Sequence, residues 1–192
     1  MKKLILTATL MLVAMMVFTS CVQNNKKQQT TPKEVKLQYE YNLFCPGDIL
    51  EFTDIEITYA DCDGTLITDT ISAGQPEVLS DGSKSTVDFH TNIKINVVPT
   101  RLYMSFRYLP KPSISAGTDK SVSTAATMYF STVNVDQIYD GYRSFESPAE
   151  SVKANELKAY FDQFNENPPT LDYTLQEKSI GVMSTLGLVK ND

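Results

Sequence analysis

Apolar and polar residues alternate along much of the chain after residue 34. Over 35–43 every second position is apolar, and lysine, glutamine, glutamate and asparagine fill the positions between. The alternation returns over 85–97 and 102–108, and more weakly over 122–135, 170–175 and 180–189. A period of two residues is typical of antiparallel strands that bury one face against a core and leave the other in water. We therefore predict a strand in each of these segments.

The longest of these segments predicts a sharply divided strand. Over 85–97 the polar face carries Asp88, His90 and Asn92, and the face that we expect to be buried comprises Val87, Phe89, Ile93, Ile95 and Val97. Pro99 follows and is expected to end or kink this strand, because proline cannot donate a backbone hydrogen bond to a neighbouring strand.

The segment 49–60 predicts a second strand whose apolar phase slips. Its apolar residues change from even to odd positions after Phe52, so a bulge or bend at Thr53–Asp54 is the simplest explanation. The Pro46–Gly47 pair before it predicts a turn that carries the chain into a second sheet. After it, Asp61–Gly64 predicts a hairpin turn with Gly64 in the left-handed region, which sets Tyr59 opposite Ile67.

One helix is predicted late in the chain. Ser147 resembles an N-cap, Pro148 suits the first helical position, and Glu150 completes a capping box. The prolines at 168–169 then end the helix. Its apolar stripe is expected to cover the sheets and comprises Ala154, Leu157, Tyr160, Phe161 and Phe164.

About eight strands and one late helix predict a mainly β domain over 35–192. We expect a two-sheet antiparallel β-sandwich. The alternative is a closed barrel of the lipocalin type, since that family also has eight strands and a late helix. The chain has no tryptophan and so lacks the Gly-x-Trp signature of that family.

The first twenty residues have the three regions of a secretory signal peptide. Lys2 and Lys3 precede an apolar run over 4–18, and the small residues Thr19 and Ser20 follow it. The run is short for a transmembrane helix, which needs about 20 residues to cross the hydrocarbon core. Residues 1–20 are therefore predicted to be a signal peptide.

The four residues Phe18-Thr19-Ser20-Cys21 resemble the lipobox of bacterial lipoproteins, with Phe18 where leucine is usual. The resemblance implies cleavage before Cys21, a diacylglycerol on its thiol, and an acylated amino terminus. An ordinary secretory signal or an uncleaved anchor is the alternative. In Gram-negative lipoproteins, a residue such as Val22 after the cysteine implies sorting to the outer membrane.

The polar segment after Cys21 predicts a flexible tether over 21–34. No acidic cluster follows Cys21, so a periplasm-facing domain is expected, with exposure on the cell surface as the alternative.

Charge and composition exclude several functions. The formal net charge is −6, and removal of Lys2 and Lys3 with the signal makes it −8, which disfavours binding to nucleic acid. Phosphate-binding loops and hydrolase motifs are missing from the sequence. His90 is the only histidine, and an Asp61-x-Asp63-Gly64 turn lacks the spacing of a calcium loop. We predict no catalytic residue, metal or cofactor.

Two cysteines remain for a disulfide if Cys21 carries lipid. A bond between Cys45 and Cys62 requires the chain to fold back between them, because a straight ten-residue strand spans about 33 Å and bridged Cα atoms lie within about 7 Å. The alternative is two free thiols.

The segment 137–145 is the candidate contact surface. Tyr139, Tyr142, Arg143 and Phe145 surround a glycine, and exposed tyrosine and arginine often anchor recognition surfaces. The alternative is that these rings pack beneath the following helix. We expect a non-catalytic module that binds a glycan, peptide or envelope protein. A pilin-like subunit that uses strand addition is the alternative, and a hydrolase with two carboxylates is third.

Overall fold

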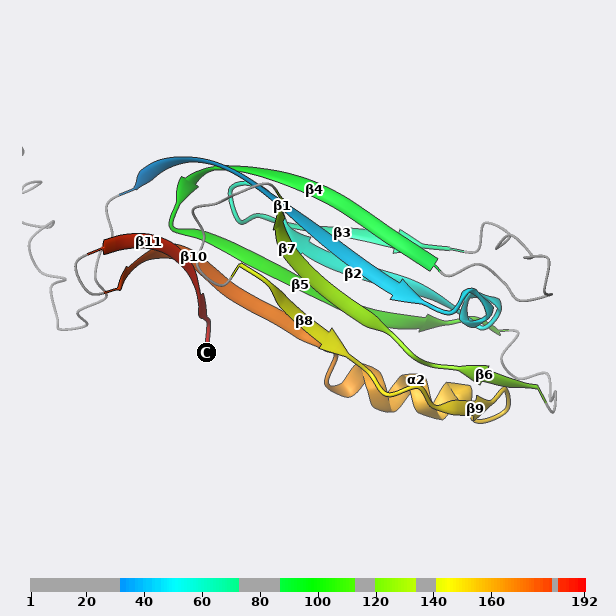
Figure 1. Ribbon diagram of the computed structural model, residues 1–192. Coiled ribbons are helices and arrows are strands. Elements are labelled where there is room, and N and C mark those ends of the chain that lie inside the picture. Colours follow the sequence, from blue (N-terminus) through cyan, green and yellow to red (C-terminus); the bar gives the residue numbers. More distant parts are fainter. Residues whose placement is uncertain (1–31, 73–86, 113–119, 134–140, 181–182) are drawn as a thin grey trace, which may run out of the picture. The chain divides into compact units, whose positions relative to one another are not determined.

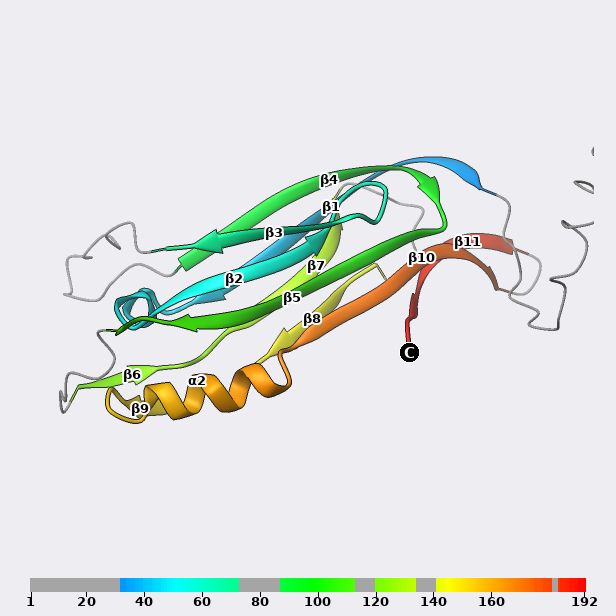
Figure 2. The ribbon, with the colours of Figure 1, turned by 180° about the vertical axis from the view of Figure 1, so that it is seen from behind.

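The computed structural model describes residues 32–72, 87–112, 120–133, 141–180 and 183–192, and residues from Pro32 onward form one compact unit. Two large antiparallel sheets make up this unit (Figures 1 and 2). Each sheet has its own strand order with two edge strands, so the described residues form no closed barrel. The predicted β-sandwich is confirmed, and the lipocalin-like alternative is wrong.

The first sheet has four strands in the order β4-β1-β7-β8. Their bounds are β1 Lys33–Cys45, β4 Val87–Val98, β7 Thr127–Val133 and β8 Arg143–Glu146. The second sheet has five strands in the order β11-β10-β5-β2-β3. Their bounds are β2 Thr53–Ala60, β3 Leu66–Ile71, β5 Thr100–Pro110, β10 Thr170–Ile180 and β11 Met183–Lys190.

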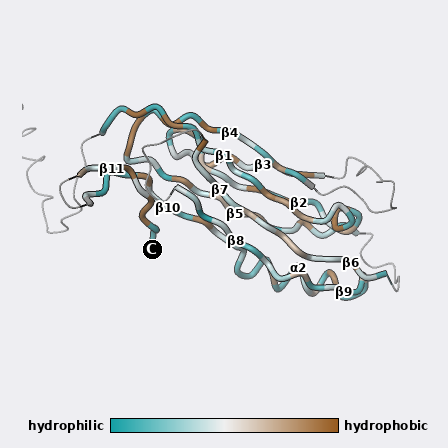
Figure 3. Tube along the Cα trace, in the orientation of Figure 1, coloured by the Kyte–Doolittle hydropathy of each residue, from teal (hydrophilic) through white to brown (hydrophobic). Residues whose placement is uncertain are grey.

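Four short elements complete the described residues. A small sheet pairs β6 (Ser121–Ser123) with β9 (Ser151–Lys153), a 3-10 helix η1 covers Gly47–Glu51, and the helix α2 covers Leu157–Glu166. Helix α2 contacts β5 and β9. Hydrophobic and hydrophilic positions follow one another along the strands, as the sequence pattern predicts (Figure 3).

The core lies between the inner faces of the two sheets. Tyr39, Tyr41 and Leu43 of β1 are fully buried there, as are Leu102, Met104, Phe106 and Tyr108 of β5. Aromatic rings join the sheets: Tyr41 lies 5.8 Å from Tyr59, and Phe130 lies 5.9 Å from Tyr173. Such ring pairs stabilise a core beyond the area that they bury.

The turn after β1 differs from the prediction. The chain crosses to the second sheet as expected, but it does so through η1, with Ile49 N–H donating to the Pro46 carbonyl at 3.1 Å. Both Leu50 and Phe52 are buried. The apolar phase therefore slips because a 3-10 helix precedes β2, and the predicted bulge at Thr53–Asp54 is wrong.

The predicted hairpin after β2 is confirmed. Gly64 has φ +83° in the β2–β3 turn, and Tyr59 pairs with Ile67. The end of β4 differs from the prediction: Val97, which was expected to be buried, is 43% exposed, and Val98 is buried. At this level β1 carries one extra residue between Glu34 and Leu37, and the buried side of β4 changes with it.

The helix begins ten residues later than its predicted N-cap. The hydroxyl of Ser147 accepts a hydrogen bond from the Ala126 amide at 2.7 Å, so it does not cap a helix. Residues 151–153 pair with β6 as β9, because this tertiary pairing outweighs the local capping signal. The predicted stripe holds from Ala154 onward, since Ala154, Leu157 and Phe161 are buried and α2 ends before the prolines.

The predicted strand over 122–135 is divided into β6 and β7. Strand β6 pairs with β9, and β7 pairs with β8, so the two parts belong to one interrupted antiparallel pairing. Between them, the Thr124 amide donates a hydrogen bond to the Glu150 carbonyl. Among the described residues, no helix has the length and apolarity to span a membrane.

Candidate functional site

The outer face of the four-stranded sheet carries the candidate site. The pairing register places on this face the alternate residues of four strands: Gln38, Glu40, Asn42, Phe44, Asp88, His90, Asn92, Lys94, Thr127, Tyr129, Ser131, Val133, Ser144 and Glu146. The residues between them, such as Tyr39, Tyr41 and Phe130, point into the core. The face is thus largely polar, and it is interrupted by aromatic rings.

Three aromatic residues form a row across this face. Phe44 on β1 and Tyr129 on β7 lie with ring centroids 6.0 Å apart and planes inclined by only 19°. Tyr142, which directly precedes β8, continues the row at 5.6 Å from Tyr129. The rings of Phe44 and Tyr129 are half-buried, and Tyr142 is 50% exposed. Aromatic carbon that lies open to solvent offers a large apolar contact area at low entropic cost.

A chain of amide and imidazole groups runs beside the aromatic row. The Gln38 Nε2 donates to Asn92 Oδ1 at 3.0 Å, and the Asn92 Nδ2 donates to His90 Nε2 at 2.8 Å. The His90 Nδ1 then lies 2.7 Å from Asn42 Oδ1. In this order Nε2 acts as an acceptor and Nδ1 as a donor.

This series of hydrogen bonds ends at the side-chain amide of Asn42, whose nitrogen has no hydrogen-bond partner among the described residues. Asn42 is only 3% exposed, and its Nδ2 makes no hydrogen bond with any described residue. Asn42 lies between His90 of β4 and Tyr129 of β7 in the pairing register. A buried amide donor that is left unpaired costs about 1–3 kcal/mol, so such a group is an expected place for an acceptor supplied from outside the chain.

Carboxylates border the aromatic row. Burial raises the pKa of the Tyr129 phenol, and the nearby charges of Glu40 and Asp88 raise it further, so this ring stays neutral at physiological pH. Glu40 Oε1 accepts a hydrogen bond from the Ser131 hydroxyl at 2.8 Å. The face therefore combines neutral aromatic rings with hydrogen-bonding groups of both kinds.

The residues predicted from the segment 137–145 separate in the structure. Tyr142 lies on the aromatic row. Arg143 and Phe145 belong to β8, not to a loop, and face inward: the Arg143 guanidinium lies 5.1 Å from the Tyr173 ring, and Phe145 lies 6.4 Å from Phe106. Tyr139 lies outside the described residues. Phe145 thus packs against the core, and Tyr142 lies exposed beside Tyr129.

Sequence reasoning missed Phe44, Tyr129 and Asn42. Each stands at an outward position of an alternating strand, and an aromatic residue at such a position is the signal that could have identified the first two. His90 shares the polar face of β4 with Asp88, but its two ring nitrogens contact Asn42 and Asn92. The structure therefore places His90 within a row of hydrogen-bonded side chains.

The two cysteines of the domain are free thiols. Cys45 ends β1 and is 2% exposed, whereas Cys62 lies exposed in the β2–β3 turn. They stand at opposite ends of the eight-residue strand β2, which at about 3.3 Å per residue separates them far beyond the reach of a disulfide. Burial raises the pKa of the Cys45 thiol to about 12, so this group is unreactive.

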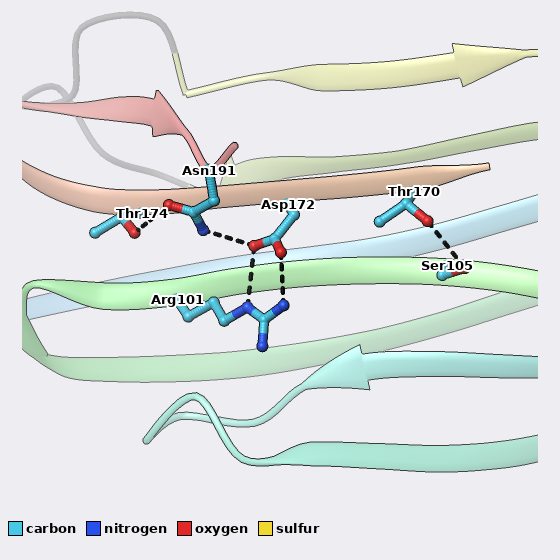
Figure 4. A network of polar contacts seen from close by, with 6 residues as sticks. All are labelled: Arg101, Ser105, Thr170, Asp172, Thr174 and Asn191. Atoms are coloured by element: carbon cyan, nitrogen blue, oxygen red, sulfur yellow. Dashed lines mark hydrogen bonds and ion pairs between the residues drawn. The ribbon is translucent and has the colours of Figure 1, made fainter. Parts of the chain in front are cut away.

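The outer face of the five-stranded sheet offers a contrast, because its charged groups bind one another (Figure 4). Arg101 Nε and Nη2 donate to the two oxygens of Asp172 at 3.0 and 2.5 Å, and Asn191 Nδ2 donates to the same carboxylate at 2.6 Å. Thr174 completes the network with a hydrogen bond to Asn191 Oδ1. This arrangement joins β5, β10 and the end of the chain, and it serves stability.

Within the described residues, no group of three histidine, cysteine or carboxylate side chains is placed to hold a metal ion. No family model, curated protein or solved structure matches this chain.

Proposed function

We propose that this chain is a lipid-anchored binding module of the bacterial cell envelope, and that its contact surface is the outer face of the four-stranded sheet. The observation that supports this proposal is the row of Phe44, Tyr129 and Tyr142 beside the unpaired amide of Asn42. Aromatic residues at open positions together with an unsatisfied donor are features of a recognition surface.

The lipobox resemblance supplies the location in this proposal. With lipid on Cys21, the outer membrane holds the chain. The segment between Cys21 and the folded unit, which begins at Pro32, would then be the tether that lets the domain reach a partner at some distance from the bilayer. A domain that faces the periplasm is favoured by the residues after Cys21, and exposure at the cell surface is the alternative.

Strand addition has less support. Strand β1 pairs with both β4 and β7, so its removal would open the centre of a sheet. Strand β11 stands at a sheet edge, yet it pairs with β10 from Tyr173–Lys190 to Ile180–Met183. Hydrolysis also has less support, because six carboxylates in the described part of the chain form ion pairs with lysine or arginine.

Hydroxyl-radical footprinting tests the proposed surface. The full chain is labelled once in isolated envelopes of the bacterium that makes it and once after purification in detergent. We expect modification of Tyr142 and Tyr129 to fall several-fold in the envelopes, because a bound partner covers them. Leu66, which is 44% exposed on the other sheet, is the control and should change little. Equal labelling of Tyr142 in both samples would contradict the proposal.

A further inference from the structure

We infer that the ligand of the outer face is an uncharged polysaccharide chain, an inference that depends on the proposed function. The composition of the face is the first reason. The centre of a protein–protein interface is usually apolar and poor in charge. Here the register surrounds the three rings with amides, hydroxyls, an imidazole and carboxylates, and Val133 is the only aliphatic residue among the outward-facing described positions from Gln38 to Phe44 of β1 and their partners.

The rings and the polar groups match the two surfaces of a sugar. A pyranose presents C–H groups, which pack on aromatic carbon, and a rim of hydroxyls, each of which donates and accepts hydrogen bonds. Phe44, Tyr129 and Tyr142 provide the apolar contacts in a row across β1, β7 and the start of β8. A row of rings fits a chain of sugars better than a single sugar.

The hydrogen bonds between these side chains run in one direction and leave one donor, Asn42 Nδ2, without an acceptor. Each side chain donates to the next: Gln38 to Asn92, Asn92 to His90, and His90 Nδ1 to Asn42 Oδ1. The Asn42 Nδ2 donor has no partner among the described residues. The group that is missing is an acceptor. Because neighbouring side chains cover Nδ2, a sugar hydroxyl would have to displace them to accept from it, and it could then donate its own hydrogen to a neighbouring acceptor such as Glu40.

Charge excludes an anionic polymer. On the described positions of this face, the three carboxylates of Glu40, Asp88 and Glu146 outnumber the two lysines, Lys36 and Lys94. A polyanion would meet net repulsion here, because no cluster of arginine or lysine faces it. The complementary ligand is therefore neutral and rich in hydroxyls.

Affinity electrophoresis tests the inference. The full chain, purified in detergent, is run through gels that contain dextran, xylan, galactomannan or mixed-linkage β-glucan, and through gels that contain polygalacturonate. We expect at least one neutral polymer to retard the chain, and polygalacturonate to have no effect. Tyr129→Ala and Tyr142→Ala should each weaken that retardation at least tenfold, and Asn92→Ala should weaken it because it breaks the amide chain.

The matched control is Tyr103→Ala, because Tyr103 pairs with Asp172 on the outer face of the other sheet. This variant should bind like the unmodified chain, and urea unfolding should show that every variant is folded. Retardation by polygalacturonate alone, or by no neutral polymer, would overturn the inference. If Tyr142 is still protected in envelopes, the proposed function stands and the partner is not a neutral polysaccharide; if that protection is also missing, the proposed function fails as well.

Discussion

At the scale of single residues, one ion pair shows how the environment of a side chain sets a pH range. Arg101 and Asp172 form two parallel hydrogen bonds, and Asn191 adds a third to the same carboxylate (Figure 4). The hydrogen bonds from Arg101 lower the pKa of Asp172 below its usual value. The ionised carboxylate is therefore favoured in the folded chain, and folding is linked to its ionisation.

This linkage predicts a pH-dependent effect of Asp172→Asn. The carboxyl of an unfolded chain titrates near pH 4, so the stabilisation by Asp172 is complete above that pH and is lost as the pH falls through the lower folded pKa. The pair is partly exposed, so we expect the variant to lose about 0.5–1 kcal/mol of unfolding free energy at pH 7. Below about pH 4 the difference should shrink, as measured by urea unfolding at several pH values.

Asp162→Asn is the matched control for this measurement. Asp162 pairs with Lys158 on the exposed side of α2, with side-chain exposures of 57% and 61%. Exposed pairs of this kind contribute little, so the control should be nearly neutral. A difference for Asp172→Asn that is as large at pH 3 as at pH 7 would show that the carboxylate does not act through its charge.

At the scale of elements, α2 acts as a substitute for a missing strand. Strand β10 begins opposite Ser105, so the β10 side of β5 has no paired strand beyond that point. The Asn165 side chain of α2 fills this place: its Nδ2 donates to the Tyr108 carbonyl at 2.7 Å, and its Oδ1 accepts from the Tyr108 amide at 3.0 Å. Phe161 and Phe164 pack on the same tyrosine ring. One side chain thus makes the two hydrogen bonds with the Tyr108 backbone that a neighbouring strand would otherwise make.

Asn165→Ala should therefore destabilise the fold more than an ordinary substitution on a helix surface. It leaves the amide and the carbonyl of fully buried Tyr108 without these partners, which we expect to cost about 1–3 kcal/mol. The measurement is the midpoint of urea unfolding. Gln163→Ala, at an exposed position of the same helix, is the control and should change stability by less than about 0.5 kcal/mol. Equal midpoints for the two variants would refute the strand-like role of Asn165.

At the scale of the whole molecule, the proposed function combines a membrane anchor with a folded binding domain. The described residues from Pro32 onward are one compact unit with its own core. The proposed anchor at Cys21 precedes that unit. Lipid attachment by two or more acyl chains holds a protein firmly to a bilayer without any contribution from its folded surface. The outer face of the four-stranded sheet is then left for a ligand.

Mass spectrometry of the chain made in a Gram-negative host tests the anchor. We expect the mature chain to begin at Cys21 and to carry a diacylglycerol on its thiol. Cys21→Ser should abolish this modification and prevent processing before residue 21. Cys62→Ser is the control and should leave the processing and the membrane fraction unchanged. A mature chain that keeps residues 1–20, or that begins at another residue, would refute the anchor.

The alternation of apolar residues was sufficient to predict most strands and their buried faces. Leu37, Tyr39 and Tyr41 in β1, and Met104 and Phe106 in β5, are buried as the pattern indicates. The turn at Gly64 and the pairing of Tyr59 with Ile67 were also predictable. These features depend on neighbours in sequence, because a period of two residues and a tight turn are local properties of the backbone.

Only the tertiary structure decided what depends on distant partners. Ser147 carries a local helix signal, yet it binds the Ala126 amide because residues 151–153 pair with β6. Phe44, Tyr129 and Tyr142 become one surface only when β1, β7 and β8 lie side by side. The candidate site could not be read from the sequence alone, since the order of strands in a sheet is set by long-range pairing that no local pattern encodes.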